Sequence, residues 1–280
     1  MKYLKLIRPH QWIKNLFVIA PLIFSGNADI SQLLISIKIV IIFIFTSSAI
    51  YVLNDIRDVK YDMRHPERKL RPIANGDIAI INATIYFFIL LASTIFLSYL
   101  FAISINAILL LSSYLILNLL YTYGFKNIPL LELVILSSGF VIRLLVGSIE
   151  AEVELSPWII VCSGLLALML AVGKRRNELS YQKDIETTTR VVLKGYNAKF
   201  LDQINSMLAS TIIVSYLLFC VSQYSIESSN TNIIWSSPMV IFNIIRYLHL
   251  VSIDSLGKDP TAILVKDKLS IGIFLSWLIF

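Results

Sequence analysis

Long apolar runs follow one another along almost the whole chain, and they limit what it can fold into. Of its 280 residues, 57% are hydrophobic and 15% are charged. Soluble domains carry about 25% charged residues, and a helix that crosses a bilayer needs about 20 mostly apolar residues. The runs predict an all-α integral membrane protein with about nine transmembrane helices in one domain, residues 1–280. The expected spans are residues 15–28, 32–53, 79–98, 103–121, 130–149, 157–173, 203–224, 233–252 and 269–280.

Positive charge is confined to one side of these spans. With residues 1–14 on the inner side, the inner segments hold all but three of the 24 Lys and Arg residues, whereas the outer connections hold none. By the positive-inside rule, we expect the N-terminus and the large polar loops to face the cytoplasm from the inner membrane. This topology accounts for the net charge of +6, so nucleic acid is not an expected partner. The inner segments are residues 1–14, 54–78, 122–129, 174–202 and 253–268.

Four polar residues, Asn54, Asp55, Asp58 and Asp62, follow directly after the second apolar run. On a helix, positions 55, 58 and 62 are spaced i, i+3 and i+7, so three carboxylates share one face. Like charges in such a group repel one another unless a cation lies between them. Mg²⁺ prefers carboxylate oxygens and often holds substrate phosphates as well. The face predicts a Mg²⁺ site for a phosphorylated substrate, with Asn54 helping to position it; a solvated helix end is the alternative.

Basic residues follow this acidic segment. Arg68, Lys69 and Arg71 are candidates for clamping phosphates above the metal, because guanidinium and ammonium groups both bind phosphate. Their alternative explanation is the positive-inside topology alone. The two cysteines and three histidines show no metal-ligand spacing, so nothing in the sequence argues for zinc.

The acidic pattern N-D-x-x-D-x-x-x-D, followed by R-P-I-A-x-G at residues 71–76, resembles the first aspartate motif of the UbiA superfamily of intramembrane prenyltransferases. The resemblance covers essentially the whole chain. It implies a UbiA-like helical bundle with a central cavity that opens to the cytoplasmic side. Typical members carry a second aspartate-rich motif after the sixth span. This chain instead has K-R-R-N-E-L at residues 174–179, with Glu178 as the lone acid.

That departure resembles the decaprenyl-phosphate phosphoribosyltransferase branch of the superfamily. In this branch the donor is water-soluble 5-phosphoribosyl 1-diphosphate, and a polyprenyl phosphate is the nucleophile. The resemblance implies Mg²⁺ as cofactor and a polyprenyl-phosphoryl-5-phosphoribose product for cell-envelope glycans of the arabinan type. Further matches are R-P-H-Q-W-I-K-N at residues 8–15, Y-T-Y-G at 121–124, S-G-F-V-I-R at 138–143, Arg246-Tyr247, Asp259-Pro260 and Lys266-Asp267.

The branch also suggests which groups contact substrate. Lys174, Arg175 and Arg176 would bind the 5-phosphate of the donor, where other members carry acidic residues. Lys14 and Asn15, at the entry of the first span, are candidates for contact with the lipid phosphate or the donor; an interfacial anchor together with Trp12 is the alternative. Arg143 lies in the middle of a span, where a charge is costly and is usually functional or paired. The remaining candidates for substrate contact are Tyr51, Tyr123, Glu178 and Arg246; for the two tyrosines, a place in the aromatic belt at the membrane interface is the alternative.

Two other functions stay open. An aromatic prenyltransferase of the same superfamily would use the first aspartate motif with an isoprenyl diphosphate, for quinone or haem precursors. The basic K-R-R-N-E-L segment argues against it, because a second acidic cluster would be expected there. A transporter or lipid scaffold would need no Mg²⁺, and charged residues in transporters more often line a path at the membrane midplane.

Overall fold

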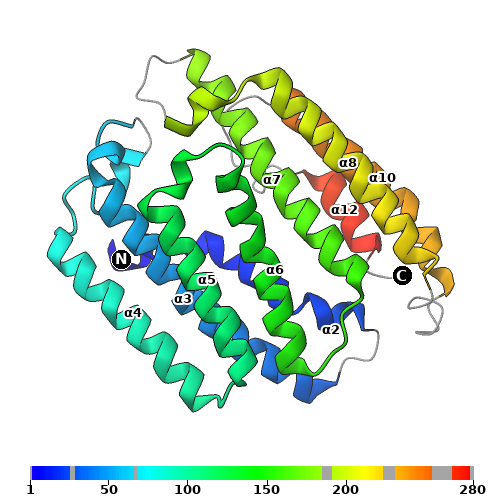
Figure 1. Ribbon diagram of the computed structural model, residues 1–280, viewed down its shortest axis with the longest axis horizontal. Helices are drawn as coiled ribbons and strands as arrows, with labels where there is room; N and C mark the ends of the chain where they lie inside the picture. Colours follow the sequence, from blue (N-terminus) through cyan, green and yellow to red (C-terminus); the bar gives the residue numbers. More distant parts are fainter. Residues whose placement is uncertain are drawn as a thin grey trace. The chain divides into compact units, whose positions relative to one another are not determined.

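The computed structural model describes residues 2–25, 29–65, 68–184, 191–222, 231–253 and 267–277. Every regular element in these ranges is a helix (Figure 1). Seven helical segments among the described residues are long and apolar enough to cross a membrane, which confirms the all-α, multi-span prediction. Six are α3 (Ile30–Asp62), α4 (Ile80–Leu100), α5 (Ile105–Tyr123), α6 (Leu131–Ala151), α7 (Pro157–Asp184) and α8 (Ala198–Cys220). The seventh, Ile233–Ser252, contains most of α10 (Ser237–Ile253).

The two ends of the chain differ from the expected spans. In place of a helix over 15–28, the structure has α1 (Lys2–Leu6), the 3₁₀ helix η1 (Pro9–Val18) and the short α2 (Ala20–Phe24). Pro9 and Pro21 each stand at the start of a helix, because proline is tolerated there and not in the interior. Arg8, before Pro9, has a left-handed backbone (φ 50°) that separates α1 from η1. At the other end, α12 (Lys268–Trp277) has ten described residues.

Two helices continue beyond their expected apolar spans. We expected spans to end at residues 53 and 173, but α3 runs to Asp62 and α7 runs to Asp184. The added turns contain no Pro or Gly, and those of α7 are rich in residues that favour helix, such as Lys, Arg, Glu and Leu. The acidic motif and the basic K-R-R-N-E-L segment therefore lie on helices, and the prediction that the three aspartates occupy helical positions is confirmed.

The chain divides into two compact units, and each is described by itself. Unit 1 comprises Met1–Ile128 and Gly139–Leu155, and unit 2 comprises Pro129–Ser138 and Ser156–Phe280. The helix α6 contributes its first turns to unit 2 and the rest to unit 1. The single domain over residues 1–280 and the central cavity stay predictions.

Unit 1 is built around α3. One buried cluster joins α1, α3 and α4 through side chains that include Leu6, Val52 and Leu90; Figure 1 shows α4 running along α3. A second cluster joins η1, α3, α5 and α6. Here the backbones of η1 and α6 come close, because a Cβ on Gly147 would lie 2.0 Å from the carbonyl oxygen of Val18.

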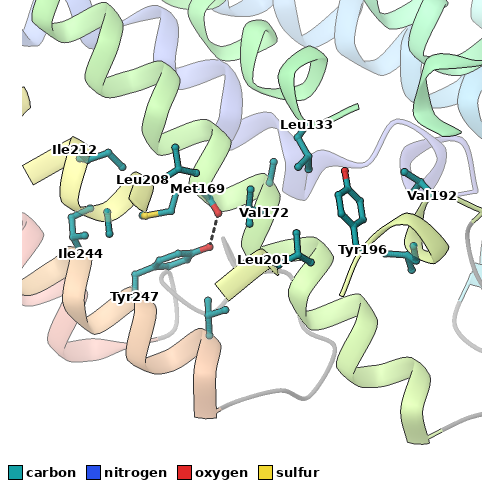
Figure 2. Close-up of a cluster of buried hydrophobic side chains, with 14 residues drawn as sticks. Leu133, Met169, Val172, Val192, Tyr196, Leu201, Leu208, Ile212, Ile244 and Tyr247 are labelled. Carbon is teal, nitrogen blue, oxygen red and sulfur yellow. Dashed lines mark hydrogen bonds between the residues drawn. The ribbon is translucent and has the colours of Figure 1, made fainter. Parts of the chain in front are cut away.

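Unit 2 packs α7, α8 and α10 around a shared apolar cluster, drawn in Figure 2. The buried Tyr247 of α10 donates a hydrogen bond from its hydroxyl to the carbonyl oxygen of Met169 on α7, at 3.2 Å. The hydroxyl fits there because residue 173 is glycine: a Cβ at Gly173 would lie 2.0 Å from it. This close approach lies directly before the basic segment of α7.

Candidate functional site

Two carboxylates of the acidic motif share cations from other segments of unit 1. Arg71 places its Nη1 3.1 Å from Asp55 Oδ1 and 2.6 Å from Asp62 Oδ2. Arg8 also donates to Asp55. Both aspartate side chains are only 2% exposed, and buried charges are stable only when they are paired. The end of α3 is therefore tied both to the α1–η1 junction and to the segment after η2 (Arg68–Leu70).

The other two residues of the motif are bonded to the end of α5 and the segment that follows it. Lys126, in η3 (Phe125–Asn127), pairs with Asp58. Thr122 donates a hydrogen bond of 2.6 Å to the side-chain oxygen of Asn54. The amide of Asn54 is therefore held in one orientation by a hydroxyl that is itself almost fully buried.

The carboxylate oxygens of Asp55, Asp58 and Asp62 are of the type that binds hard cations, although all three carboxylates form ion pairs in this structure. No three His, Cys, Asp or Glu side chains of the described ranges lie close enough together to hold a metal ion. However, Asp62 Oδ1 is buried and has no hydrogen-bond partner among the residues that the structure describes. A carboxylate oxygen in that state suits Mg²⁺. The assignment of Asp55, Asp58 and Asp62 as the residues that would hold the ion stays a prediction.

Arg143 and Asn15 are bonded to each other inside unit 1. Arg143 donates from Nε to Asn15 Oδ1 at 2.9 Å, from Nη1 to the Gly139 carbonyl at 2.8 Å and from Nη2 to the Tyr114 hydroxyl at 2.9 Å. Its guanidinium also lies 5.4 Å from the ring centre of Phe43. The mid-helix charge predicted from sequence is thus satisfied by neutral groups, and substrate contact by this pair stays a prediction.

The remaining candidates of unit 1 lie on α3, α5, η1 and η2. The Arg8 guanidinium lies 5.2 Å from the ring centre of Tyr51, and Arg57 lies 5.4 Å from that of Tyr123. Lys14, on η1, is half-buried. Arg68 and Lys69 form part of η2, with Arg68 half-buried and Lys69 exposed. The structure therefore places these groups, and their contacts with substrate stay predictions.

In unit 2, Arg175 is buried between two carboxylates. Its Nε and Nη2 donate to the two oxygens of Glu132 on α6, and its Nη1 lies 2.7 Å from Glu178 Oε2. The side chains of Arg175 and Glu132 are 1% and 0% exposed. This geometry favours a role in holding carboxylates over direct contact with a phosphate.

The neighbouring cations of unit 2 have other positions. Arg176 donates to Asp202 on α8 at 2.8 Å, and Lys174 is half-buried on α7. Arg246 of α10 makes a two-bond ion pair with Asp267, at 3.1 and 3.0 Å. The hydrogen bonds from Arg246 and Ser270 hold the pKa of Asp267 well below its usual range. The sequence matches at Asp259, Pro260 and Lys266 lie outside the described residues.

Comparison with known proteins places the chain in a family. The sequence model of the UbiA prenyltransferase family matches residues 15–269. The chain belongs to the UbiA prenyltransferase family. It is 33% identical to a decaprenyl-phosphate phosphoribosyltransferase of Corynebacterium glutamicum, over 98% of this chain and 83% of that protein. A protein of the same name from Mycolicibacterium smegmatis is 30% identical, over 98% of this chain and 89% of that protein.

Solved structures support the UbiA fold. A UbiA homolog from Archaeoglobus fulgidus, bound to DMAPP and Mg²⁺, has a TM-score of 0.75 at 18% identity and covers 100% of this chain and 98% of its own. The same homolog bound to GPP and Mg²⁺ also has a TM-score of 0.75, at 19% identity and with the same coverage. The predictions of a UbiA-like helical fold and of resemblance to the phosphoribosyltransferase branch are both confirmed.

The sequence did not predict several side chains of this UbiA-family protein that bond the candidate site residues. Arg8, Lys126 and Thr122 bond the acidic motif, and Glu132 bonds Arg175. Arg8 and Thr122 stood within matched motifs without an assigned role. Glu132 offered one usable signal, since an acidic residue near the start of an apolar span needs a partner when it is buried.

Proposed function

We propose that this protein is a Mg²⁺-dependent membrane phosphoribosyltransferase. It transfers phosphoribose from 5-phosphoribosyl 1-diphosphate to a polyprenyl phosphate and releases diphosphate. The similarity over 98% of the chain to proteins named decaprenyl-phosphate phosphoribosyltransferase is the observation that carries this proposal. The product, polyprenyl-phosphoryl-5-phosphoribose, supplies cell-envelope glycans of the arabinan type. The basic segment on α7, in place of a second acidic cluster, favours a sugar phosphate as substrate.

The acidic end of α3 is the proposed site for the donor diphosphate. Mg²⁺ held by Asp55, Asp58 and Asp62 would supply charge neutralisation on the leaving diphosphate. The hydrogen bond from Thr122 fixes the orientation of the Asn54 amide next to Asp55. Arg71, together with Arg68 and Lys69, adds cations that stabilise the charge that develops as diphosphate leaves.

The bond from C1 of ribose to the diphosphate oxygen breaks, and a bond from C1 to an oxygen of the lipid phosphate forms. The lipid phosphate is already anionic near neutral pH, so the reaction needs no strong general base. Lys14, Asn15, Tyr51, Tyr123, Arg143 and Arg246 are the proposed further contacts to donor and lipid.

The membrane arrangement follows from the charges. The protein crosses the membrane several times, and we assign the N-terminus and the site-bearing helix ends to the cytoplasmic side of the inner membrane, because the basic residues gather there. The polyprenyl phosphate then reaches the acidic end of α3 from the bilayer, with its phosphate at the cytoplasmic surface. A single UbiA-like bundle with a cavity open to that side accommodates its chain.

A direct assay tests this function. Purified full-length protein in detergent is mixed with Mg²⁺, a polyprenyl phosphate and 5-phosphoribosyl 1-diphosphate labelled in the ribose, and the mixture is extracted with organic solvent. We expect label in the lipid phase and its loss when EDTA is added. Asp58→Asn should lower kcat/KM roughly 100-fold, whereas Asp202→Asn, a paired carboxylate outside the proposed site, should not. Folded protein that instead prenylates an aromatic acid from an isoprenyl diphosphate would establish the alternative function.

A further inference from the structure

A groove on unit 1 lies between the short α1 and the first half of α4. It has a volume of about 360 Å³, which is within the range of small-ligand sites, about 300–1,000 Å³. The acidic motif of α3, which the structure describes in full, does not line this groove. The residues from α4 are spaced i, i+3, i+4 and i+7, so they share one face of that helix. The lining residues are Tyr3, Asn82, Ile85, Tyr86 and Ile89.

The groove changes from polar to apolar along α4. This helix begins at Ile80, and its 21 residues extend about 30 Å, which matches the hydrocarbon core of a bilayer. We therefore expect Asn82, in the first turn, to lie at the level of the lipid headgroups. Ile89 would lie about 10 Å deeper. Ile85 and Ile89 are each 53% exposed, so this part of the groove presents an apolar surface to lipid chains.

Cations lie at the polar end of the groove. Lys2 Nζ is 3.0 Å from Oδ1 of Asp77, which precedes α4, and both side chains are exposed. The pKa of Asp77 is held below its usual range by hydrogen bonds from Asn75 and Lys2, and also by the nearby charges of Lys2 and Lys5. Lys5 itself forms no ion pair with any residue that the structure describes. Two ammonium groups thus accompany one carboxylate, which leaves a positive charge at this end.

The wall of the groove that comes from α1 is held in place by packing. The rings of Tyr3 and Tyr86 meet edge to face, with their centres 5.1 Å apart, and Leu6 is buried in the cluster that joins α1, α3 and α4. Tyrosine, with an apolar ring and a polar hydroxyl, suits the membrane interface. Because α1 continues into Arg8, which donates to Asp55, an occupant of the groove would also stabilise the segment that carries Arg8.

We propose that this groove binds an anionic phospholipid of the surrounding membrane. Lys2 and Lys5 pair with the headgroup phosphate, and the side-chain amide of Asn82 donates a hydrogen bond to it. One acyl chain lies along Ile85 and Ile89. The excess positive charge selects an anionic headgroup over a zwitterionic one. Because the groove is lined by none of the groups assigned to the reaction, the inference does not depend on the proposed phosphoribosyltransferase function.

Lipids of defined charge test the headgroup site. Purified full-length protein in detergent is mixed with equal amounts of phosphatidylglycerol and phosphatidylcholine of the same acyl chains, and the retained lipids are counted by native mass spectrometry. We expect a preference of about 5- to 25-fold for phosphatidylglycerol, since one lysine near the membrane surface contributes about 5-fold. The double variant Lys2→Gln/Lys5→Gln should abolish this preference. The control Lys194→Gln/Lys199→Gln, which removes two exposed lysines of unit 2, should keep it.

A second pair of variants tests the groove itself. Ile85→Trp fills the groove without changing any charge, so it should lower the retention of phosphatidylglycerol at least 5-fold. Ile95→Trp makes the same change at an exposed position of α4 outside the groove and should leave the retention unchanged. Both positions are exposed, so we expect both variants to fold, and their melting temperatures in detergent verify this.

Four outcomes would overturn the proposal. An equal loss of preference in the Lys194→Gln/Lys199→Gln control would indicate unspecific attraction, and normal retention in Ile85→Trp would place the lipid elsewhere. Displacement of phosphatidylglycerol by an equal amount of polyprenyl phosphate would make the groove a site for the reacting lipid. A dimer that Ile85→Trp dissociates would make a second copy of the chain the occupant. Because no turnover is measured, each of these outcomes leaves the proposed transfer reaction to its own assay.

Discussion

Replacing Gly173 by alanine should destabilise the protein, although alanine is the better helix former. The new Cβ would lie 2.0 Å from the hydroxyl of Tyr247, so the buried ring must move. The variant then loses the hydrogen bond to Met169, worth about 1 kcal/mol, and strains a packed core by about 1–3 kcal/mol. Alanine returns about 1 kcal/mol in helix propensity. We expect a net loss of about 1–3 kcal/mol, measured by unfolding in mixed micelles and followed by circular dichroism.

The Tyr247→Phe background provides the control for this prediction. Without the hydroxyl, the nearest atom to the new Cβ is the ring carbon Cζ at 3.2 Å, followed by Val251 Cγ2 at 3.6 Å. Small shifts relieve such contacts, so Gly173→Ala should be neutral or stabilise this background by up to about 1 kcal/mol. A double-mutant cycle of Gly173→Ala and Tyr247→Phe should therefore show a coupling energy of about 2 kcal/mol between the two positions. An equal loss in both backgrounds would refute the argument that the hydroxyl is what excludes a side chain at position 173.

Three further predictions concern other contacts. Glu132→Gln leaves Arg175 buried with one carboxylate fewer, and it should lower the free energy of unfolding by about 3–5 kcal/mol; a loss below about 1 kcal/mol in the same unfolding assay would contradict the buried pair. Gly147→Ala places a Cβ 2.0 Å from the backbone oxygen of Val18, which cannot rotate away, so it should cost about 3 kcal/mol or prevent folding, as judged by yield and melting temperature. Asp267→Asn should lower the melting temperature near pH 7, and because the pKa of this aspartate is depressed in the folded state, the difference should shrink as the pH falls below about 4; a difference that stays constant with pH would count against the ion pair.

The apolar runs predicted most of the helices because span length and hydropathy are local properties. The expected helix at residues 15–28 is not formed: the 3₁₀ helix η1, which begins at Pro9, ends at Val18, and the short α2 has Pro21 in its first turn. The helix ends also differed from the prediction. A hydropathy criterion ends a span at its last apolar residue, whereas α3 and α7 continue as helix into the polar turns that follow. Composition thus predicts where a span lies, and capping and breaking residues decide where the helix stops.

The site was predictable only in part, for a related reason. The helical spacing of the aspartates identified the acidic face, but their partners come from distant segments: Lys126 stands 68 residues after Asp58. The sequence predicts Arg175 as a ligand of the donor 5-phosphate, and its burial against Glu132, 43 residues earlier, is not visible in the sequence. Ion pairs between segments that are distant in sequence depend on how the helices pack, so a local sequence pattern does not predict them.

The length of α3 has a consequence for where the chemistry takes place. Its 33 residues extend about 50 Å at 1.5 Å per residue, whereas the hydrocarbon core of a bilayer is about 30 Å thick. In the proposed topology, the turns that carry Asp55, Asp58 and Asp62 would extend beyond the hydrocarbon core to the headgroup layer, where the phosphate of the proposed acceptor would lie. We then expect the lipid to react without lifting its chain out of the membrane, and the thickness of the bilayer to set the depth of the site.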